Sequence, residues 1–289
     1  MIDINVVAHY LHIKGIRMTV ADVSAAAIEI QKNHSLPTLT AYIMGKILSG
    51  TVTLAADFKN EEGISLLWRT TSDLGTIHAD VYKGGYVRGY PEHVMNPDVE
   101  HTRNNEKEVV SAPGSQITVT RYSLLKRPYS STILLSKGDI SDCFMQYLKE
   151  SEQTRSIIKA DVKTDKNGQI IRAGAYMAQL LPEGDHNLFH LLFEEKEYSL
   201  FEDSNIESLS KLLKAEKFKE LSKTPLSFKC TCSEEKIKNT LLSLPKTEKE
   251  KLLNQEVTEI SCRHCGKAYK IQRDILKNWF LCTGGHSHE

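Results

Sequence analysis

Apolar residues recur at helical spacing in two segments near the start of the chain. The first is the alanine-rich segment 19–33, where a helix is predicted because its apolar residues share one side: Val23, Ala27, Ile28 and Ile30. Ser35 and Pro37 follow, and both are typical of helix starts. They predict a second helix, whose apolar positions are Tyr42, Ile43, Ile47 and Leu48.

From residue 64 the period of the apolar positions changes to two, which is typical of strands. Three strands are predicted at 64–68, 76–82 and 86–90, the last two joined by a turn at Gly84-Gly85, and Ile117 and Val119 mark a fourth. Asn167-Gly168 is a strong hairpin signal, and it predicts a turn between strands 156–164 and 169–180.

Asp139 is predicted to cap a third helix. The inner face of that helix consists of Ile140, Cys143, Phe144, Tyr147 and Leu148. Helices and paired strands alternate here without a βαβ rhythm, which favours an α+β fold over residues 1–182.

The composition changes after Pro182, and sixteen of the 41 residues from 183 to 223 are charged. Ile206, Leu209 and Leu213 nevertheless fall on one helical face, and Phe218 follows them. The pattern predicts one or two amphipathic helices, ending at Pro225, whose apolar stripe needs a partner. We therefore expect a helical linker over 183–227, followed by a small module over 228–289.

The overall composition is ordinary for a folded protein: 289 residues, 40% apolar and 26% charged. Lys and Arg balance Asp and Glu at 37 each, and this zero net charge argues against a chain that coats nucleic acid or an anionic membrane. No apolar run approaches the ~18 residues of a membrane span, and the first residues do not resemble a secretory signal. We expect a cytoplasmic protein without a membrane segment.

Five of the six cysteines lie in the last sixty residues. Such clustering in a large chain is typical of metal or redox chemistry in a reducing compartment rather than of a disulfide-stapled secreted domain. A module of about sixty residues also buries too little apolar surface to be secure alone, so a metal or crosslink is physically expected.

Two cysteine pairs carry the candidate chemistry: Cys230 with Cys232, and Cys262 with Cys265. Four thiolates from two short pairs can close a tetrahedral zinc shell, and Gly266 allows the tight turn of a zinc knuckle. We predict that these four cysteines bind one Zn²⁺. The simplest interpretation of this spacing alone is a static structural zinc.

One detail favours a redox role. The first pair is separated by one residue rather than two, so a disulfide within it would close a small, strained ring. Strained disulfides are the labile and regulatory kind. Structural zinc contributes about 10–16 kcal/mol of folding free energy in small modules, so ligand oxidation should unfold the module and, through it, free the apolar stripe of the linker.

Two other functions remain open at this point. A nucleic-acid-binding zinc ribbon is one, although residues 228–289 carry 11 Lys and Arg against 8 Asp and Glu, a formal +3 that four thiolates and Zn²⁺ reduce to +1. A thiol oxidoreductase using Cys262-Arg263-His264-Cys265 is the other, although such cysteines usually lie at a helix N-terminus. No hydrolase or nucleotide-binding motif occurs, so we expect no enzyme.

The remaining cysteines and nearby histidines are assigned no role in this site. Cys143 is predicted to be a small core residue because it falls on the apolar face of its helix. Cys282, His286 and His288 lie in a short tail, where they could bind metal adventitiously.

The chain resembles the redox-regulated heat-shock protein 33 chaperone family (33 kDa chaperonin) over about residues 5–280. The two cysteine pairs carry part of the resemblance, with Phe228-Lys229 leading in. The rest is carried by motifs similar to that family's core-domain signatures: Asp73-Leu74-Gly75, Gly85-Tyr86-Val87-Arg88-Gly89-Tyr90, Pro128-Tyr129-Ser130, Ser151-Glu152-Gln153-Thr154 and Gln179-Leu180-Leu181-Pro182.

The resemblance implies an ATP-independent holdase that is inactive while reduced and zinc-bound. It implies that oxidants convert the four cysteines into two local disulfides, that zinc leaves, and that linker and module unfold. The exposed surface, often in a dimer, then captures unfolding proteins. On this basis the four apolar linker residues are our candidates for client binding: Ile206, Leu209, Leu213 and Phe218.

Overall fold

The computed structural model describes residues 5–55, 62–95, 106–123, 126–201 and 206–281. It has a mixed α+β architecture and divides into two compact units, Met1–Lys229 and Cys230–Glu289. The segment 183–227, predicted as a separate linker, therefore belongs to the first unit. Among the described residues, no helix has the length and apolar character needed to cross a membrane.

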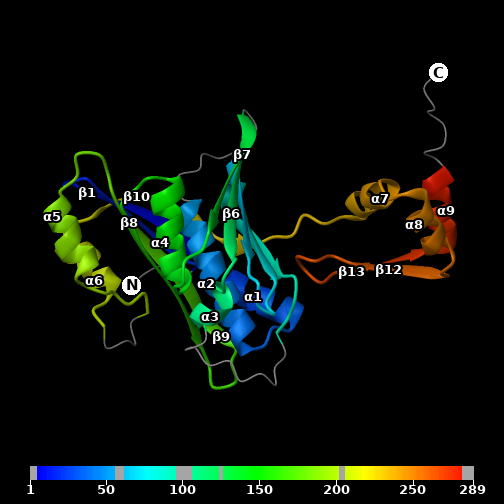
Figure 1. Cartoon of the computed structure of the whole chain (residues 1–289), viewed down its shortest axis with the longest axis horizontal. Coiled ribbons are helices and arrows are strands. Elements are labelled where there is room, and N and C mark those ends of the chain that lie inside the picture. Colours follow the sequence, from blue (N-terminus) through cyan, green and yellow to red (C-terminus); the bar gives the residue numbers. More distant parts are fainter. Residues whose placement is uncertain (1–4, 56–61, 96–105, 124–125, 202–205, 282–289) are drawn as a thin grey trace. The chain divides into compact units, whose positions relative to one another are not determined.

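The first unit contains a five-stranded antiparallel sheet (Figure 1). Its strand order is β10 (Lys219–Pro225), β1 (Val6–His12), β2 (Ile16–Asp22), β9 (Ile170–Leu180) and β8 (Ser156–Thr164). The pairing of β10 with β1 joins the beginning and the end of this unit, since more than 200 residues separate the two strands in the chain.

A second sheet of six strands lies in the same unit. Its order is β11 (Ser227–Phe228), β5 (Tyr86–Pro91), β4 (Thr76–Tyr82), β3 (Glu62–Arg69), β6 (Gln116–Ser123) and β7 (Lys126–Leu134). All its pairings are antiparallel except that of the short β11 with β5. The chain thus reaches this second sheet directly after leaving β10 of the first.

Helix α2 (Thr38–Leu54) contacts strands of both sheets, and every one of its residues except Thr38 is buried. A helix that is apolar on all sides is stable only where both faces are covered, which explains its place at the centre of the main core. Three further helices pack around it: α1 (Ser24–His34), α3 (Glu106–Val110) and α4 (Ile140–Ser151). The one charged residue of α2, Lys46, pairs with buried Glu106 at 2.8 Å.

The inner strands β2 and β9 of the five-stranded sheet are largely buried on both faces. Along β9, Ala173 and Met177 belong to the main core, whereas Tyr176, Ala178 and Leu180 belong to a second apolar cluster. The helical elements that complete this second cluster come from 183–227: α5 (His186–Phe189), the π-helical turn His190–Glu194 that continues it, and α6 (Leu209–Ala215). Figure 1 shows α5 and α6 lying on one side of this sheet and α2 on the other.

Most of the predicted elements of the first unit are confirmed. The second helix, strands β3, β4, β5 and β6, and the hairpin at Asn167-Gly168 appear where the pattern placed them. Asp139 caps α4 in a reciprocal capping box, accepting from the amide of Asp142 at 2.9 Å while its own amide donates to the Asp142 carboxylate. All five predicted inner-face residues of α4 are buried.

Two predictions are wrong. The first predicted helix loses its first four residues to β2, and α1 begins only at Ser24. Pairing with β1 on one side and β9 on the other overrides the helical pattern of this segment. Likewise, 219–225 is strand β10 rather than helix: the open edge of β1 binds its backbone, while Leu221 stays 53% exposed.

The second unit is small. A hairpin of β12 (Val257–Ser261) and β13 (Ala268–Gln272) packs with α7 (Glu234–Leu242), α8 (Lys246–Leu253) and α9 (Arg273–Leu281). Among the described residues of this unit, three apolar side chains are fully buried: Leu241, Ile271 and Leu276. The other apolar side chains that pack against them are partly exposed. So little buried apolar surface stabilises a fold weakly, as the sequence led us to expect.

Candidate metal centre

The four predicted cysteines lie in two short segments of the chain. Cys230 and Cys232 precede α7, whose N-cap Ser233 accepts a hydrogen bond from the amide of Lys236. Cys262 and Cys265 lie in the turn that joins β12 to β13.

Backbone hydrogen bonds shape that turn. The amide of Cys262 donates to the carbonyl of Lys267 at 2.9 Å, and the amide of Gly266 donates back to Cys262 at 2.8 Å. Gly266 has φ 68°, a left-handed conformation that glycine adopts without strain, as a knuckle requires. The pair therefore lies in a knuckle and not at a helix N-terminus, which weakens the oxidoreductase hypothesis.

The structure brings all four sulfur atoms together. They lie within 4.8 Å of one another, with Sγ–Sγ distances of 3.5 Å for Cys230–Cys262 and for Cys232–Cys265. Around an ion with metal–sulfur bonds of about 2.3 Å, a regular tetrahedron places its sulfurs about 3.8 Å apart. The four side chains, each half-buried, could therefore hold one metal ion.

Hydrogen bonding divides the four thiols. Tyr269, on β13, donates its hydroxyl to Cys232 Sγ at 3.2 Å. Burial acts to raise the pKa of Cys232, but this bond and those from the other thiols outweigh it and lower the pKa to about 7. Burial raises the pKa of Cys265 to about 12 and also raises that of Cys230. Without a cation the cluster favours one thiolate, so a bound metal is what would gather four.

Tyr269 is the residue of the site that the sequence pattern missed. The cysteine spacing gives no signal for it, and the structure places it on β13. Its position four residues after Cys265 places its hydroxyl over the cluster once the hairpin closes. That hydroxyl bond also raises the pKa of Tyr269 to about 12.

The predicted client-binding residues belong to the first unit, whereas the four cysteines belong to the second. Leu209 and Leu213 are buried in the second apolar cluster. Phe218 packs against it half-buried, with its ring 5.1 Å from that of His12. Ile206 is 47% exposed and is not part of the cluster. The structure thus brings three of the four together.

The remaining cysteine assignments divide between core and tail. Cys143 is buried in the main core, as predicted, and burial raises the pKa of its thiol to about 12, with Asp142, Asp139 and Glu106 adding to the effect. Cys282, His286 and His288 lie outside the described residues.

A four-cysteine cluster that could hold one metal ion, on a small unit preceded by a large α+β unit, defines a two-unit protein with a candidate metal-binding module. The family model described as Hsp33 protein matches residues 5–272, and the chain belongs to this family. It is 29% identical over 273 residues to the 33 kDa chaperonin of Streptococcus pyogenes serotype M49, covering 90% of this chain and 93% of that protein, and 30% identical over the same spans to that of serotype M2.

The fold has a counterpart among solved structures. The crystal structure of the 33 kDa chaperonin (heat shock protein 33 homolog) of Thermotoga maritima aligns with a TM-score of 0.78 at 23% identity, covering 96% of this chain and 98% of that one. Family membership supports a chaperone role for this chain, and the names of its relatives are consistent with a protein that is not an enzyme.

Proposed function

We propose that this protein is a redox-regulated, ATP-independent holdase. The reduced, zinc-bound form is inactive, and oxidation of the four clustered cysteines releases zinc and unfolds the C-terminal unit. The observation that carries the proposal is the convergence of four sulfur atoms, within 4.8 Å, in a unit whose apolar core has three fully buried side chains among the residues that the structure describes.

The donor set supports zinc as the ion. Four thiolates with no oxygen donor suit Zn²⁺ in a closed, structural site. Bound Zn²⁺ would crosslink the two knuckles and contribute about 10–16 kcal/mol of folding free energy. Since whole domains are stable by only about 5–15 kcal/mol, Cys230–Glu289 should not stay folded once its four cysteines lose the ion.

Oxidation removes the ligands themselves. Two cysteine thiols lose two protons and two electrons as one S–S bond forms, and one hydrogen peroxide accepts them to give two waters. Two disulfides therefore consume two peroxides and leave no thiolate for the metal. Family resemblance supports the local pairs Cys230–Cys232 and Cys262–Cys265, although each described close sulfur contact joins one knuckle to the other.

The second apolar cluster is the proposed client surface. Leu209 and Leu213 cover the sheet residues Met18, Val20 and Tyr176, all of which are nearly inaccessible in the folded state. Removing α6 and β10 would expose both the apolar side of α6 and the sheet face beneath it. Contiguous apolar surface of this kind binds unfolding chains without a sequence preference.

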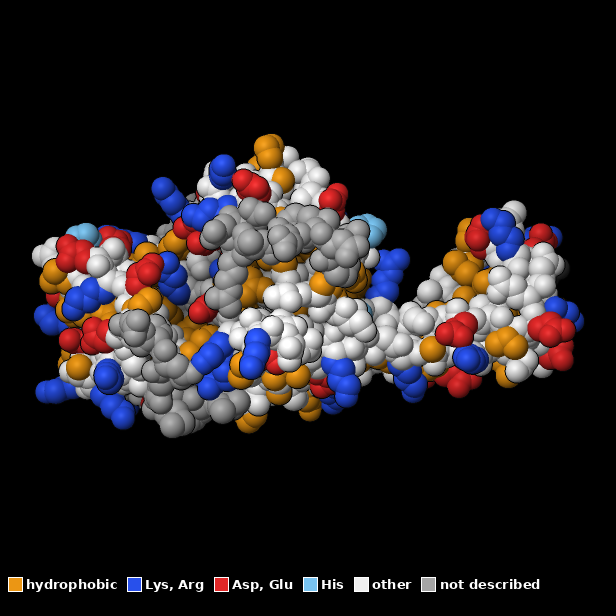
Figure 2. All heavy atoms as spheres, turned by 90° about the horizontal axis from the view of Figure 1, so that it is seen from below, with side chains coloured by type: hydrophobic (Ala, Val, Ile, Leu, Met, Phe, Trp, Pro, Cys, Tyr) orange, Lys and Arg blue, Asp and Glu red, His pale blue; other side chains and the backbone are white. Residues whose placement is uncertain are grey.

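Charge pattern and redox chemistry support the remaining parts of the proposal. On the face shown in Figure 2, acidic and basic side chains of the described residues are intermixed, in keeping with a net charge of zero. That face carries no broad basic patch of the kind that binds nucleic acid. Thiolate ligands persist in a reducing compartment, which supports the cytoplasm as the location. Exposed apolar surface would also allow the oxidised protein to form a homodimer.

Peroxide treatment at mildly raised temperature tests the proposal. We expect release of one zinc per chain, followed by suppression of light scattering from a thermally unfolding client protein, and reversal of both effects by a thiol reductant and zinc. The variant Cys143→Ala is the matched control, because it removes a buried thiol outside the cluster and should respond like the unaltered protein. Full zinc loss with unchanged client aggregation would contradict the proposal.

A further inference from the structure

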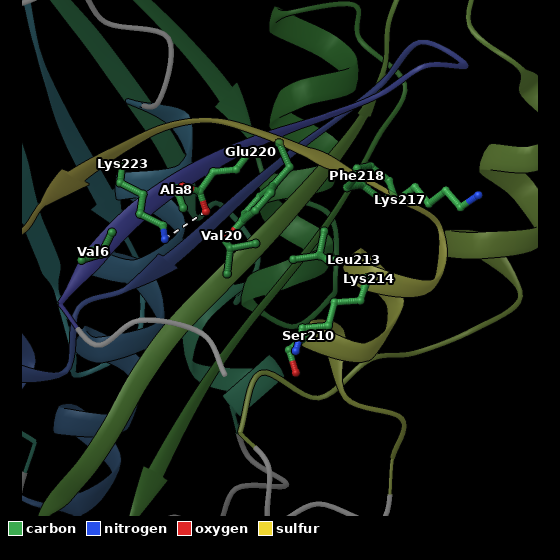
Figure 3. Close-up of a pocket in the computed structure, with 11 residues that line it drawn as sticks. Val6, Ala8, Val20, Ser210, Leu213, Lys214, Lys217, Phe218, Glu220 and Lys223 are labelled. Atoms are coloured by element: carbon green, nitrogen blue, oxygen red, sulfur yellow. Dashed lines mark ion pairs between the residues drawn. The ribbon is translucent and has the colours of Figure 1, made fainter.

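A pocket of about 580 Å³ lies between α6 and the strands of the five-stranded sheet (Figure 3). Its apolar lining comes from both sides: Val6, Ala8 and Val20 belong to β1 and β2, and Leu213 and Phe218 belong to α6 and the turn after it. A volume of this size is within the range of small-molecule sites. Of this lining, Val6 and Phe218 are partly exposed, whereas Ala8, Val20 and Leu213 are buried.

Charged residues at the rim of the pocket are mainly basic. Three lysines, Lys214, Lys217 and Lys223, accompany a single acid, Glu220, so the rim carries 3 − 1 = +2. Lys223 pairs with Glu220 at 3.0 Å, whereas Lys214 forms no ion pair with any residue that the structure describes. Figure 3 shows Lys217 extending away from the apolar lining, so Lys214 is the cation available to a ligand.

The apolar lining and the basic rim together restrict the kind of ligand that fits the pocket. A small inorganic anion would pair with Lys214 but leave the exposed parts of Val6 and Phe218 in water. An uncharged hydrocarbon would cover these side chains but leave the basic rim uncompensated. Only a molecule with an apolar chain and an anionic head satisfies both, since apolar burial and opposite charge contribute separately to affinity.

We propose that this pocket binds a single-chain anionic amphiphile, an unbranched alkyl chain that ends in a carboxylate. The chain covers the exposed parts of Val6 and Phe218, and the carboxylate pairs with the ammonium group of Lys214. Because the lining comes from β1 and β2 on one side and from 209–223 on the other, the ligand contacts both and stabilises their packing. This binding step does not depend on the proposed chaperone function.

Calorimetric titration of the full-length, reduced, zinc-loaded protein with decanoate tests the proposal. Decanol supplies the same chain without the charge, and acetate supplies the carboxylate without the chain. We expect saturable binding of decanoate at one site, at least fivefold weaker binding of decanol, and no measurable binding of acetate. Equal affinities for decanoate and decanol, or no binding of decanoate, would overturn the proposal.

Charge reversal on α6 localises the site. Lys214→Glu should weaken decanoate binding by about fivefold or more, since it replaces an attraction by a repulsion near the head group. Lys211→Glu is the control, because Lys211 is exposed on the same helix but does not line the pocket, and its effect should stay below about twofold. Equal losses in the two variants would show that decanoate responds only to the net charge of the surface.

Hydrogen exchange distinguishes binding of decanoate in the pocket from its non-specific adsorption to the surface. Amides in 209–225 exchange when this segment opens away from the sheet. Because decanoate binds only the packed state, decanoate at ten times its dissociation constant should slow this exchange by about tenfold. Exchange in Cys230–Glu289 should stay unchanged. Protection confined to that second unit, or absent from 209–225, would place the ligand elsewhere and overturn the proposal.

Discussion

The carbonyl oxygen of Pro225 occupies the position that a Cβ atom on Gly85 would need. Gly85 lies in the turn between β4 and β5, and Pro225 ends β10, so the contact fastens the end of the 183–227 segment to the second sheet. Leu226 is buried in the main core directly afterwards, and the amide of Lys229 donates to Val87. The chain is thus anchored one residue before Cys230.

Substitution of Gly85 by alanine should detach this anchor. Gly85 has φ 76°, which costs an alanine about 1 kcal/mol, and the overlap with Pro225 adds about 1–3 kcal/mol. We expect Gly85→Ala to lower the free energy of unfolding of the first unit by this sum in urea titrations, with faster amide exchange at Leu226 and Lys229. Gly84→Ala is the control: Gly84 has φ 78°, but its added Cβ would make only ordinary contact with Tyr86, so only the backbone cost applies. Equal effects of the two substitutions would contradict the anchor.

Metal removal should affect the two units unequally. A chelator strong enough to strip zinc from thiolates should abolish amide protection in Cys230–Glu289, because three buried apolar side chains cannot stabilise that unit alone. The buried residues of α2 should keep their protection under reducing conditions. Hydrogen exchange followed by mass spectrometry measures both, and retained protection around Leu276 in the stripped protein would contradict this expectation.

Truncation of the 183–227 segment's buried side chains should mimic activation. Leu209 is fully buried, so Leu209→Ala should cost about 2–4 kcal/mol and loosen α6 from the sheet. We expect the reduced, zinc-loaded variant to bind an apolar dye and to suppress client aggregation without oxidant. Ile206→Ala is the matched control, since Ile206 is 47% exposed, and it should change neither readout. Client binding that needs oxidation in both variants would remove the second apolar cluster from the proposal.

Acid should weaken the packing of the π-helical turn. Burial acts to raise the pKa of Glu194, but hydrogen bonds from Arg155 and His190 outweigh it and hold this pKa below its ordinary 4.5. A lowered pKa in the folded state stabilises that state above pH 4.5, and the contribution disappears as the pH falls through the lowered value. Glu194→Gln should therefore cost less than about 1 kcal/mol at pH 7 and nothing near pH 3, as urea titrations at both pH values would show. Glu195→Gln is the control: the Glu195 carboxylate contacts the ring of His190 at 3.2 Å, and its substitution should give a smaller difference between the two pH values.

The cysteine cluster and several single helices and strands could be predicted from spacing and periodicity, without knowledge of the fold. A one-residue and a two-residue spacing each form a turn regardless of distant contacts, so a cluster of Cys230, Cys232, Cys262 and Cys265 could be predicted from their spacing alone. The capping box at Asp139 and the hairpin at Asn167-Gly168 are equally local. The contact of Tyr269 with Cys232 was not readable, because it appears only when the hairpin folds over the first knuckle.

The sequence by itself determined the α+β class, several helices and strands of the first unit, and the four-cysteine set, because these follow from interactions between residues close in the chain. Only the tertiary structure decided that Thr19–Asp22 and Lys219–Pro225 are strands, that Leu209 and Leu213 are buried while Ile206 is not, and that Gly85 meets Pro225. The physical reason is that a strand edge or an apolar face is satisfied by whichever segment the folded chain brings to it, and local pattern does not encode that partner.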